Sequence, residues 1–197
     1  MRRPGGYRAG DTVAVFGVGP VGLVHVAKAA LTGAGRVVGI DRFPARLAIA
    51  EALGATDTVV VADNAERAAA GARELLGGGA DVVVDATGHP SSFGPALSLL
   101  RDGGTLLEVG AFVDLGTIPI NPADILGRNL TIVGVAGEDA RVYDATLQLL
   151  AEHHDRVPFH LAVTHRFPIE QAEEAMHTAL GAGDAMKVII VPASEAG

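Results

Sequence analysis

Six short apolar runs, separated by stretches with helix signals, limit what this chain can fold into. Most of the runs are continuous in Val, Ile and Leu, which is typical of parallel strands that are covered on both faces. They lie at Thr12–Phe16, Arg36–Ile40, Thr58–Val61, Asp81–Asp85, Thr105–Val109 and Leu130–Val135. Strands alternating with helices in this way predict an α/β fold, a doubly wound parallel sheet of six strands.

The predicted helices between these runs have recognisable ends. Pro stands in the first turn of Pro20–Leu31 and of Pro44–Leu53, and a Gly follows soon after each of them. Asn64–Leu76 ends in three glycines, and Ser92–Leu100 begins with a Ser cap. Each helix joins two consecutive strands, as the right-handed crossovers of a parallel sheet require.

After about residue 138 the pattern changes to a short α+β tail. Helices are predicted at Ala140–His153 and Ile169–Leu180, and strands at Leu161–Phe167 and Lys187–Val191. A segment of about 60 residues is small for a core of its own, so we expect it to pack against another part of the protein. We therefore divide the chain into a first domain, residues 1–138, and a C-terminal segment, residues 139–197.

The loop after the first predicted strand reads GVGPVG, which fits the pattern G-x-G-x-x-G. The pattern alone would be weak in a chain with 26 glycines, but here it follows a strand, opens a helix and precedes a second strand that ends in Asp41. In that context it predicts a dinucleotide site. Gly17 permits the tight turn, Gly19 lets the backbone approach the pyrophosphate, and Gly22 lets the helix pack closely.

The start of the helix after this loop completes the predicted anion site. Its free N–H groups and the positive end of its dipole would hold the pyrophosphate, so Pro20 and Val21 join the predicted cofactor-binding residues. A glycine-rich turn without a ligand is the alternative.

Asp41 also bears on the choice of cofactor. Its carboxylate can accept both hydroxyl protons of the adenosine ribose, whereas a 2′-phosphate beside it would cost about 1–4 kcal/mol in repulsion. The sequence therefore favours NAD over NADP. Arg42, the next residue, is the complication, because an Arg there can bind the 2′-phosphate.

The composition excludes several other functions. With 15 basic and 23 acidic residues the net charge is −8, which argues against nucleic acid or an anionic membrane as the partner. The start of the chain does not read as a signal peptide and no apolar run reaches a membrane span, so we expect a cytoplasmic protein. The chain has no cysteine, and its seven histidines lack the paired spacing of metal ligands, so we expect no metal site. One of these histidines, His25, either approaches the cofactor or lies on a helix surface.

Several segments resemble the medium-chain dehydrogenase/reductase family, the zinc-type alcohol dehydrogenases. They are GDTVAVFGVGPVGLVHVAKA, VVGIDRFPARLAIAEALGA, DVVVDATG, RDGGTLLEVGAF and AMKVIIV. NPADILGRNLTIVGV and VTHRFPIEQAEEAM are most similar to the threonine and polyol dehydrogenase branch. The resemblance covers about Tyr7 to Pro192 and implies the NAD-binding Rossmann domain of an oxidoreductase.

The resemblance also implies what this chain lacks. Such enzymes begin with a GroES-like catalytic domain that supplies the ligands of a catalytic zinc and a four-cysteine structural zinc lobe. This chain starts just before the Rossmann strand and has no cysteine, so we expect no catalytic residue, no zinc and no activity from it alone. Three interpretations of the chain remain open: a fragment of an oxidoreductase, a stand-alone NAD-binding sensor or regulator, and a dimerisation remnant. The intact glycines and Asp41 argue against the dimerisation remnant.

Further cofactor contacts follow from the resemblance. Arg46 matches a basic position against the adenosine ribose and Lys187 one that reaches the pyrophosphate, with a solvated surface charge as the alternative for each. Seven residues match positions beneath the adenine-side ribose and around the nicotinamide: Ala86, Thr87, Gly88, Val109, Gly110, Val135 and Gly137. Glu108 departs from the usual aliphatic residue, and either points into solvent or alters the nicotinamide pocket.

The last predicted strand of the sheet, within Asn129–Val135, bears on assembly. The doubly wound order places it outermost, where the flat apolar sequence NLTIVGV would be an aggregation hazard if left open. The resemblance implies that this strand pairs with its twofold mate, and such isologous pairing is the commonest route to a homo-oligomer. We therefore expect a homodimer through Asn129–Val135. Looser association at the surface that a catalytic half would cover is the alternative.

Overall fold

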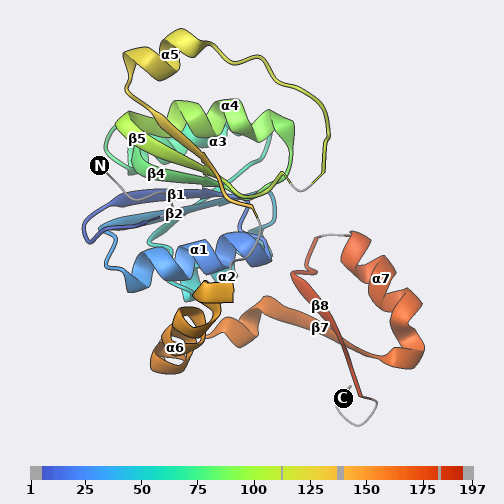
Figure 1. Cartoon of the computed structure of the whole chain (residues 1–197). Coiled ribbons are helices and arrows are strands. Elements are labelled where there is room, and N and C mark those ends of the chain that lie inside the picture. Colours follow the sequence, from blue (N-terminus) through green and yellow to red (C-terminus); the bar gives the residue numbers. More distant parts are fainter. Residues whose placement is uncertain (1–5, 112, 137–139, 182, 193–197) are drawn as a thin grey trace.

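Six parallel strands form the main sheet of the protein. The computed structural model describes residues 6–111, 113–136, 140–181 and 183–192. Its strand order is β3-β2-β1-β4-β5-β6, and the last two strands, β7 and β8, form a separate two-stranded sheet (Figure 1). The strands of the main sheet are β1 Thr12–Phe16, β2 Arg36–Asp41, β3 Asp57–Val60, β4 Ala80–Asp85, β5 Leu100–Glu108 and β6 Thr131–Gly134. This confirms the predicted doubly wound fold, with the order reversing between β1 and β4.

Helices cover both faces of this sheet, as Figure 1 shows. They are α1 Pro20–Leu31, α2 Pro44–Ala52, α3 Ala65–Leu75 and α4 Pro90–Leu99. Val13 and Val15 of β1 belong to the core cluster that contains α1 and α2, whereas Ala14 and Phe16 belong to the cluster with α3 and α4. Both faces of the strand are therefore buried, which is why the strand sequences are continuously apolar.

The structure departs most from the sequence predictions at two boundaries and in one additional helix. β5 begins at Leu100 and not at Thr105, because Leu100 pairs with Ala80 ahead of a register shift, while the polar residues after it are exposed. α4 begins at Pro90 and not at Ser92, since proline takes the first helical position and His89 becomes the cap. The short helix α5, Pro122–Gly127, was not predicted; the Asn121 side chain caps it.

The C-terminal segment has a sheet of its own. It contains α6 Tyr143–His153, β7 Val163–Pro168, α7 Ala172–Gly181 and β8 Lys187–Val191, with 3-10 turns at Ala140–Val142, Phe159–Ala162 and Ile169–Gln171. The predicted helices at Ala140 and Ile169 therefore each begin as a 3-10 turn. β7 and β8 run parallel, and Val157 and Met186 join the core cluster of α1 and α2. The predicted boundary at residue 138 lies outside the described residues.

No helix in the described parts of the chain combines the length and the apolar character that a membrane crossing needs.

Gly22 is the residue at which α1 lies closest to the loop after β1. A Cβ on Gly22 would overlap the carbonyl oxygen of Gly17. We expect Gly22→Ala to lower the free energy of unfolding by about 1–3 kcal/mol, because the helix or the loop must move. Urea unfolding measures this, with Gly71→Ala in α3 as the control.

The control site is open, since a Cβ on Gly71 would meet no atom within 4 Å. Gly71→Ala should therefore raise stability by about 0.5–1 kcal/mol, the usual gain in a helix interior. A Gly22→Ala protein as stable as the unmodified chain would show that the close approach of α1 is not required.

Candidate functional site

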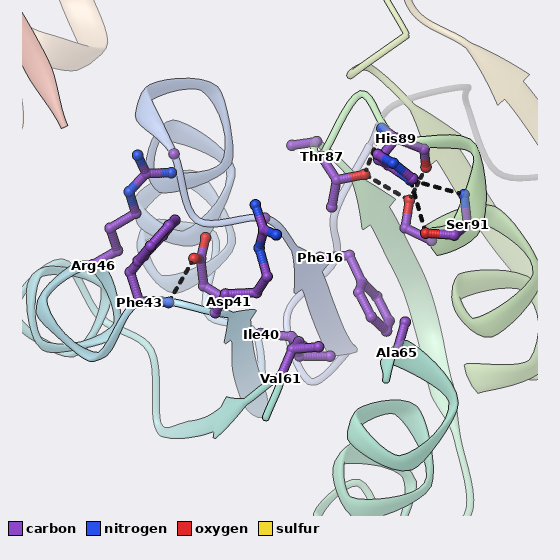
Figure 2. Close-up of a pocket in the computed structure, with 15 residues that line it drawn as sticks. Phe16, Ile40, Asp41, Phe43, Arg46, Val61, Ala65, Thr87, His89 and Ser91 are labelled. Atoms are coloured by element: carbon purple, nitrogen blue, oxygen red, sulfur yellow. Dashed lines mark hydrogen bonds between the residues drawn. The ribbon is translucent and has the colours of Figure 1, made fainter. Parts of the chain in front are cut away.

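A cavity of about 260 Å³ lies at the carboxyl ends of β1, β2 and β4, where the strand order reverses. Ligands of doubly wound sheets bind at this position. Figure 2 shows Asp41, Phe43 and Arg46 on one side of the cavity and Thr87 and His89 on the other. The structure brings together seven of the predicted cofactor residues in its lining: Gly17, Gly19, Asp41, Arg42, Arg46, Ala86 and Thr87.

The glycine loop presents bare backbone to this cavity. Gly17 has φ +79°, a conformation that favours glycine, and a Cβ on it would lie 3.0 Å from the Ala86 carbonyl carbon. Above Gly19 there is room, since a Cβ there would meet only Arg46 Nη1, at 3.9 Å. This open backbone is the kind of cradle that a pyrophosphate needs.

The first turn of α1 adds to the anion site. Gly19 caps the helix without a side-chain bond, Pro20 occupies its first turn, and that turn contains no acidic residue. A bound anion would therefore meet the positive end of the helix dipole without an opposing carboxylate from α1. Val21 is 43% exposed, whereas Gly22 is buried against the loop.

Asp41, the last residue of β2, is fixed beside the glycine loop. It is 7% exposed. Its Oδ2 accepts a hydrogen bond from the Val18 N–H at 2.9 Å. Its Oδ1 accepts one from the Phe43 N–H at 3.0 Å, which Figure 2 shows. Each carboxylate oxygen has a second acceptor position, so both can still receive ribose hydroxyls.

Two guanidinium groups lie over the ring of Phe43, two residues after Asp41. The Arg42 group is 5.5 Å from the centre of the Phe43 ring, and the Arg46 group is 4.8 Å from it. Arg46 is half-buried, and its Nη2 donates to the Ala185 carbonyl at 3.0 Å. Its Nε is buried without a hydrogen-bond partner in the described part of the chain. Arg46 thus joins the cavity to the segment just before β8.

The turn after β4 is held by Asp85, the last residue of that strand. Its Oδ1 accepts from the N–H and the hydroxyl of Thr87, at 3.1 and 2.8 Å. Its Oδ2 accepts from the Ser92 hydroxyl at 2.6 Å. Gly88 has φ +71°, and a Cβ on it would lie 2.7 Å from the Gly110 carbonyl oxygen, so this turn lies close to the turn after β5.

Glu108, the last residue of β5, turns back onto the backbone that follows it. Its Oε1 accepts from the N–H groups of Gly110 and Ala111, both at 3.0 Å. Burial raises the pKa of the Glu108 carboxyl above its usual value, and the negative charge of Asp85 raises it further. The side chain is half-buried, so the expectation that it simply points into solvent is wrong.

The other predicted residues that the structure describes do not line this cavity. Val109 is buried, and Val135, 43% exposed, donates its N–H to the Glu108 carbonyl. Lys187 is exposed at the start of β8. Gly137 lies outside the described residues.

His25 is not in the cavity. Its Nδ1 is hydrogen-bonded to the Tyr7 hydroxyl, and burial, then the Lys28 charge, lower its pKa to about 4. This histidine is therefore part of the packing of α1 against Tyr7. Across the described ranges, no three His, Asp or Glu side chains are grouped as a metal site would need.

Sequence reasoning missed about half of the cavity lining. The missed residues are Phe16, Ile40, Phe43, Val61, Ala65, His89, Ser91 and Ser92. All of them lie near or after the carboxyl ends of strands β1 to β4. These ends are where such sheets bind ligands, so strand position was the available signal.

The chain is similar to zinc-binding dehydrogenases in sequence. The sequence profile of the family described as zinc-binding dehydrogenase matches residues 20–152. The 5-exo-hydroxycamphor dehydrogenase of Pseudomonas putida is 37% identical over 182 residues, which is 91% of this chain and 50% of that protein. The L-threonine 3-dehydrogenase of Bacillus subtilis strain 168 is 33% identical over 191 residues, 93% of this chain and 52% of that enzyme. The chain thus spans about half the length of these relatives.

Solved structures agree with the sequence matches. A zinc-binding dehydrogenase from Sinorhizobium meliloti 1021, bound to NADP, superposes with a TM-score of 0.82 at 30% identity. The match covers 95% of this chain and 54% of that one.

The half-buried carboxyl of Glu108 leads to a prediction about stability and pH. Because its pKa is raised in the folded protein, the carboxyl favours folding below its unfolded pKa, and this contribution is lost as the pH rises through the folded pKa. Glu108→Gln keeps an acceptor for Gly110 and Ala111 but removes the charge. Its melting temperature should exceed that of the unmodified chain at pH 7, and the difference should shrink toward pH 4.

The control for this measurement is Glu152→Gln, at an exposed glutamate of α6. It should show no gain of comparable size. A Glu108→Gln protein that melts at the same temperature as the unmodified chain throughout this pH range would contradict the role of the buried charge.

Proposed function

The chain belongs to the zinc-binding dehydrogenase family, and we propose that it is the cofactor-binding half of such an enzyme, selective for NAD(H). The observation that carries this proposal is the position of Asp41. Its carboxylate is fixed by the Val18 and Phe43 N–H groups beside the open backbone of Gly19. A ribose hydroxyl acceptor next to a pyrophosphate cradle is what the adenosine half of the cofactor requires.

In this proposal the pyrophosphate lies over the glycine loop. Gly17 and Gly19 line the cavity, and the first turn of α1, with Pro20, Val21 and Gly22, directs its dipole toward the phosphates. The basic groups of the site complete the binding of the diphosphate and ribose: Arg42, Arg46 and Lys187.

The nicotinamide would extend from there over the ends of β4, β5 and β6. Six described residues are proposed to line this part: Ala86, Thr87, Gly88, Val109, Gly110 and Val135. When bound, the nicotinamide ring gives or takes a hydride. The residues of this chain hold and orient the cofactor, and the reacting alcohol would be supplied from elsewhere.

The choice of NAD over NADP rests on Asp41. Its carboxylate would repel a 2′-phosphate, whereas Arg42 and Arg46 beside it would attract one. The relative from Sinorhizobium meliloti 1021 is bound to NADP, so the 2′-phosphate can be accommodated in a similar protein. We place the greater weight on Asp41, because it is buried and fixed while Arg42 is exposed.

Titration of the protein with NADH and NADPH tests the proposal. The protein should bind NADH at least several-fold more tightly than NADPH. Asp41→Gly should bring the two affinities closer together, because the acceptor for the ribose hydroxyls and the charge that repels the 2′-phosphate are both lost. Arg42→Ala is the matched control and should weaken NADPH more than NADH. Equal or reversed affinities in the unmodified chain would refute the NAD preference, and binding of neither nucleotide would refute the cofactor site itself.

We further propose that the alcohol chemistry belongs to a separate catalytic half. Family relatives are about twice as long as this chain, and its sequence contains no cysteine. Deprotonation of an alcohol by a Lewis-acid metal requires a ligand set that the described residues do not group together. We propose accordingly that the chain alone, in the cytoplasm or in the test tube, binds the cofactor without oxidising an alcohol.

A homodimer through β6 is also proposed. β6 is the outer strand of the sheet, paired with β5 on one side. Ile132 is 37% and Val135 is 43% exposed. Antiparallel pairing of β6 with its twofold mate would cover this apolar edge and satisfy its free backbone groups.

Light scattering tests the proposed dimer. Ile132→Lys should give a monomer or insoluble protein, because it places a charge in the pairing edge. Val60→Lys is the control: Val60 is 47% exposed at the end of β3, the opposite edge of the sheet, and should leave the dimer intact. A monomeric unmodified chain, or a dimer indifferent to Ile132→Lys, would contradict the proposal.

A further inference from the structure

Three strands of the sheet end in an acidic residue that folds back onto its own turn. Asp41 ends β2, Asp85 ends β4 and Glu108 ends β5. Each accepts a hydrogen bond from the backbone N–H two residues later, at 3.0, 3.1 and 3.0 Å. The same kind of hydrogen bond therefore holds the turn after each of three strands, all at the carboxyl ends of the sheet.

Glu108 differs from the other two in what it holds. Its Oε1 bonds two successive N–H groups, those of Gly110 and Ala111. On the opposite side the turn is confined by the backbone after β4: a Cβ on Gly110 would lie 2.8 Å from the Ala86 carbonyl carbon and 2.9 Å from the Thr87 nitrogen. The turn after β5 is therefore held by steric contact on one side and by one carboxylate on the other.

We infer that Glu108 is a positioning residue for the nicotinamide end of the site, because its hydrogen bonds to Gly110 and Ala111 set the place of the turn that begins at Val109. The inference rests on the proposed cofactor role of that turn. It assigns a function to a side chain that does not line the first cavity and that would act on the cofactor only through the backbone that it holds.

The effect of Glu108 should be confined to one half of the cofactor. Glu108 lines a second cavity, of about 430 Å³, together with Asp85, His89 and Asp114 as the other ionisable groups. Asp41 and the glycine loop line the first cavity instead, at the carboxyl ends of β2 and β1, and Glu108 does not line that cavity. Loss of the Glu108 bonds should therefore disturb nicotinamide binding and leave adenosine binding in place.

Two variants and two ligands separate these effects. Glu108→Val removes the acceptor, and Glu108→Gln keeps it. Each protein is titrated with NADH and with ADP-ribose, which lacks the nicotinamide. Glu108→Val should weaken the binding of NADH about fivefold or more, which is a loss that two hydrogen bonds can account for. The affinity for ADP-ribose should change less than twofold. Glu108→Gln should bind both ligands within twofold of the unmodified chain.

Hydrogen exchange gives a second measurement that needs no ligand. The amides of Gly110 and Ala111 should exchange faster in Glu108→Val than in the unmodified chain, and Glu108→Gln should restore their protection. If Glu108→Val does not fold, Glu108→Ala replaces it, and ADP-ribose binding reports that the site is intact.

The outcomes are distinct for the inference and for the proposed function. Three outcomes would each overturn the positioning role. The affinity for NADH is unchanged in Glu108→Val, or Glu108→Val loses equal affinity for NADH and for ADP-ribose. The third is a Glu108→Gln protein that binds NADH as weakly as Glu108→Val does. An unmodified chain that binds neither ligand would overturn the cofactor function and the inference together. If Glu108→Val loses affinity for NADH but not for ADP-ribose, and Glu108→Gln retains it, the result supports the proposed cofactor function and the positioning role.

Discussion

The close approach of α1 to the loop after β1 is the constraint on which the rest of the site depends. It is possible because Gly22 has no side chain, and the Gly17 carbonyl oxygen occupies the place where a Cβ would be. The approach brings the start of the helix against the open backbone of Gly19. The Val18 N–H then reaches the Asp41 carboxylate, so the end of β2 is tied to the same loop. Helix, loop and neighbouring strand are thereby fixed by contacts among four residues.

Carboxylates at the ends of β2, β4 and β5 organise the remainder of this sheet edge. Parallel strands finish together, and the turns that leave them have backbone N–H groups that need acceptors. Asp41, Asp85 and Glu108 supply these acceptors from the last position of each strand. The arrangement concentrates negative charge where an anionic cofactor is proposed to lie. The guanidinium groups of Arg42 and Arg46 therefore have to offset the charge of the carboxylates as well as that of the cofactor.

Local signals predicted much of this structure, and long-range contacts account for what they missed. The bounds of β1 and β8 match the predictions because each strand is a short apolar run between turn residues. The glycine loop and Asp41 were predictable because their spacing occurs between a predicted strand, a predicted helix and a second predicted strand. The bond from Arg46 to Ala185 joins residues 139 positions apart and leaves no local trace. The orientation of Glu108 also depends on the packed turn beside it, which no periodicity reveals.

The central place of β1 also bears on the order in which the chain folds. β1 pairs with β2, which follows closely in sequence, and with β4, which begins only at Ala80. The half-sheet β1-β2-β3 is complete by Val60, so it can assemble while the rest of the chain is still being synthesised. At usual translation rates, the roughly 20 residues up to β4 take about one to four seconds. During that interval the inner edge of β1 is an open, apolar strand edge, and a chaperone or a second nascent chain can reach it before β4 does.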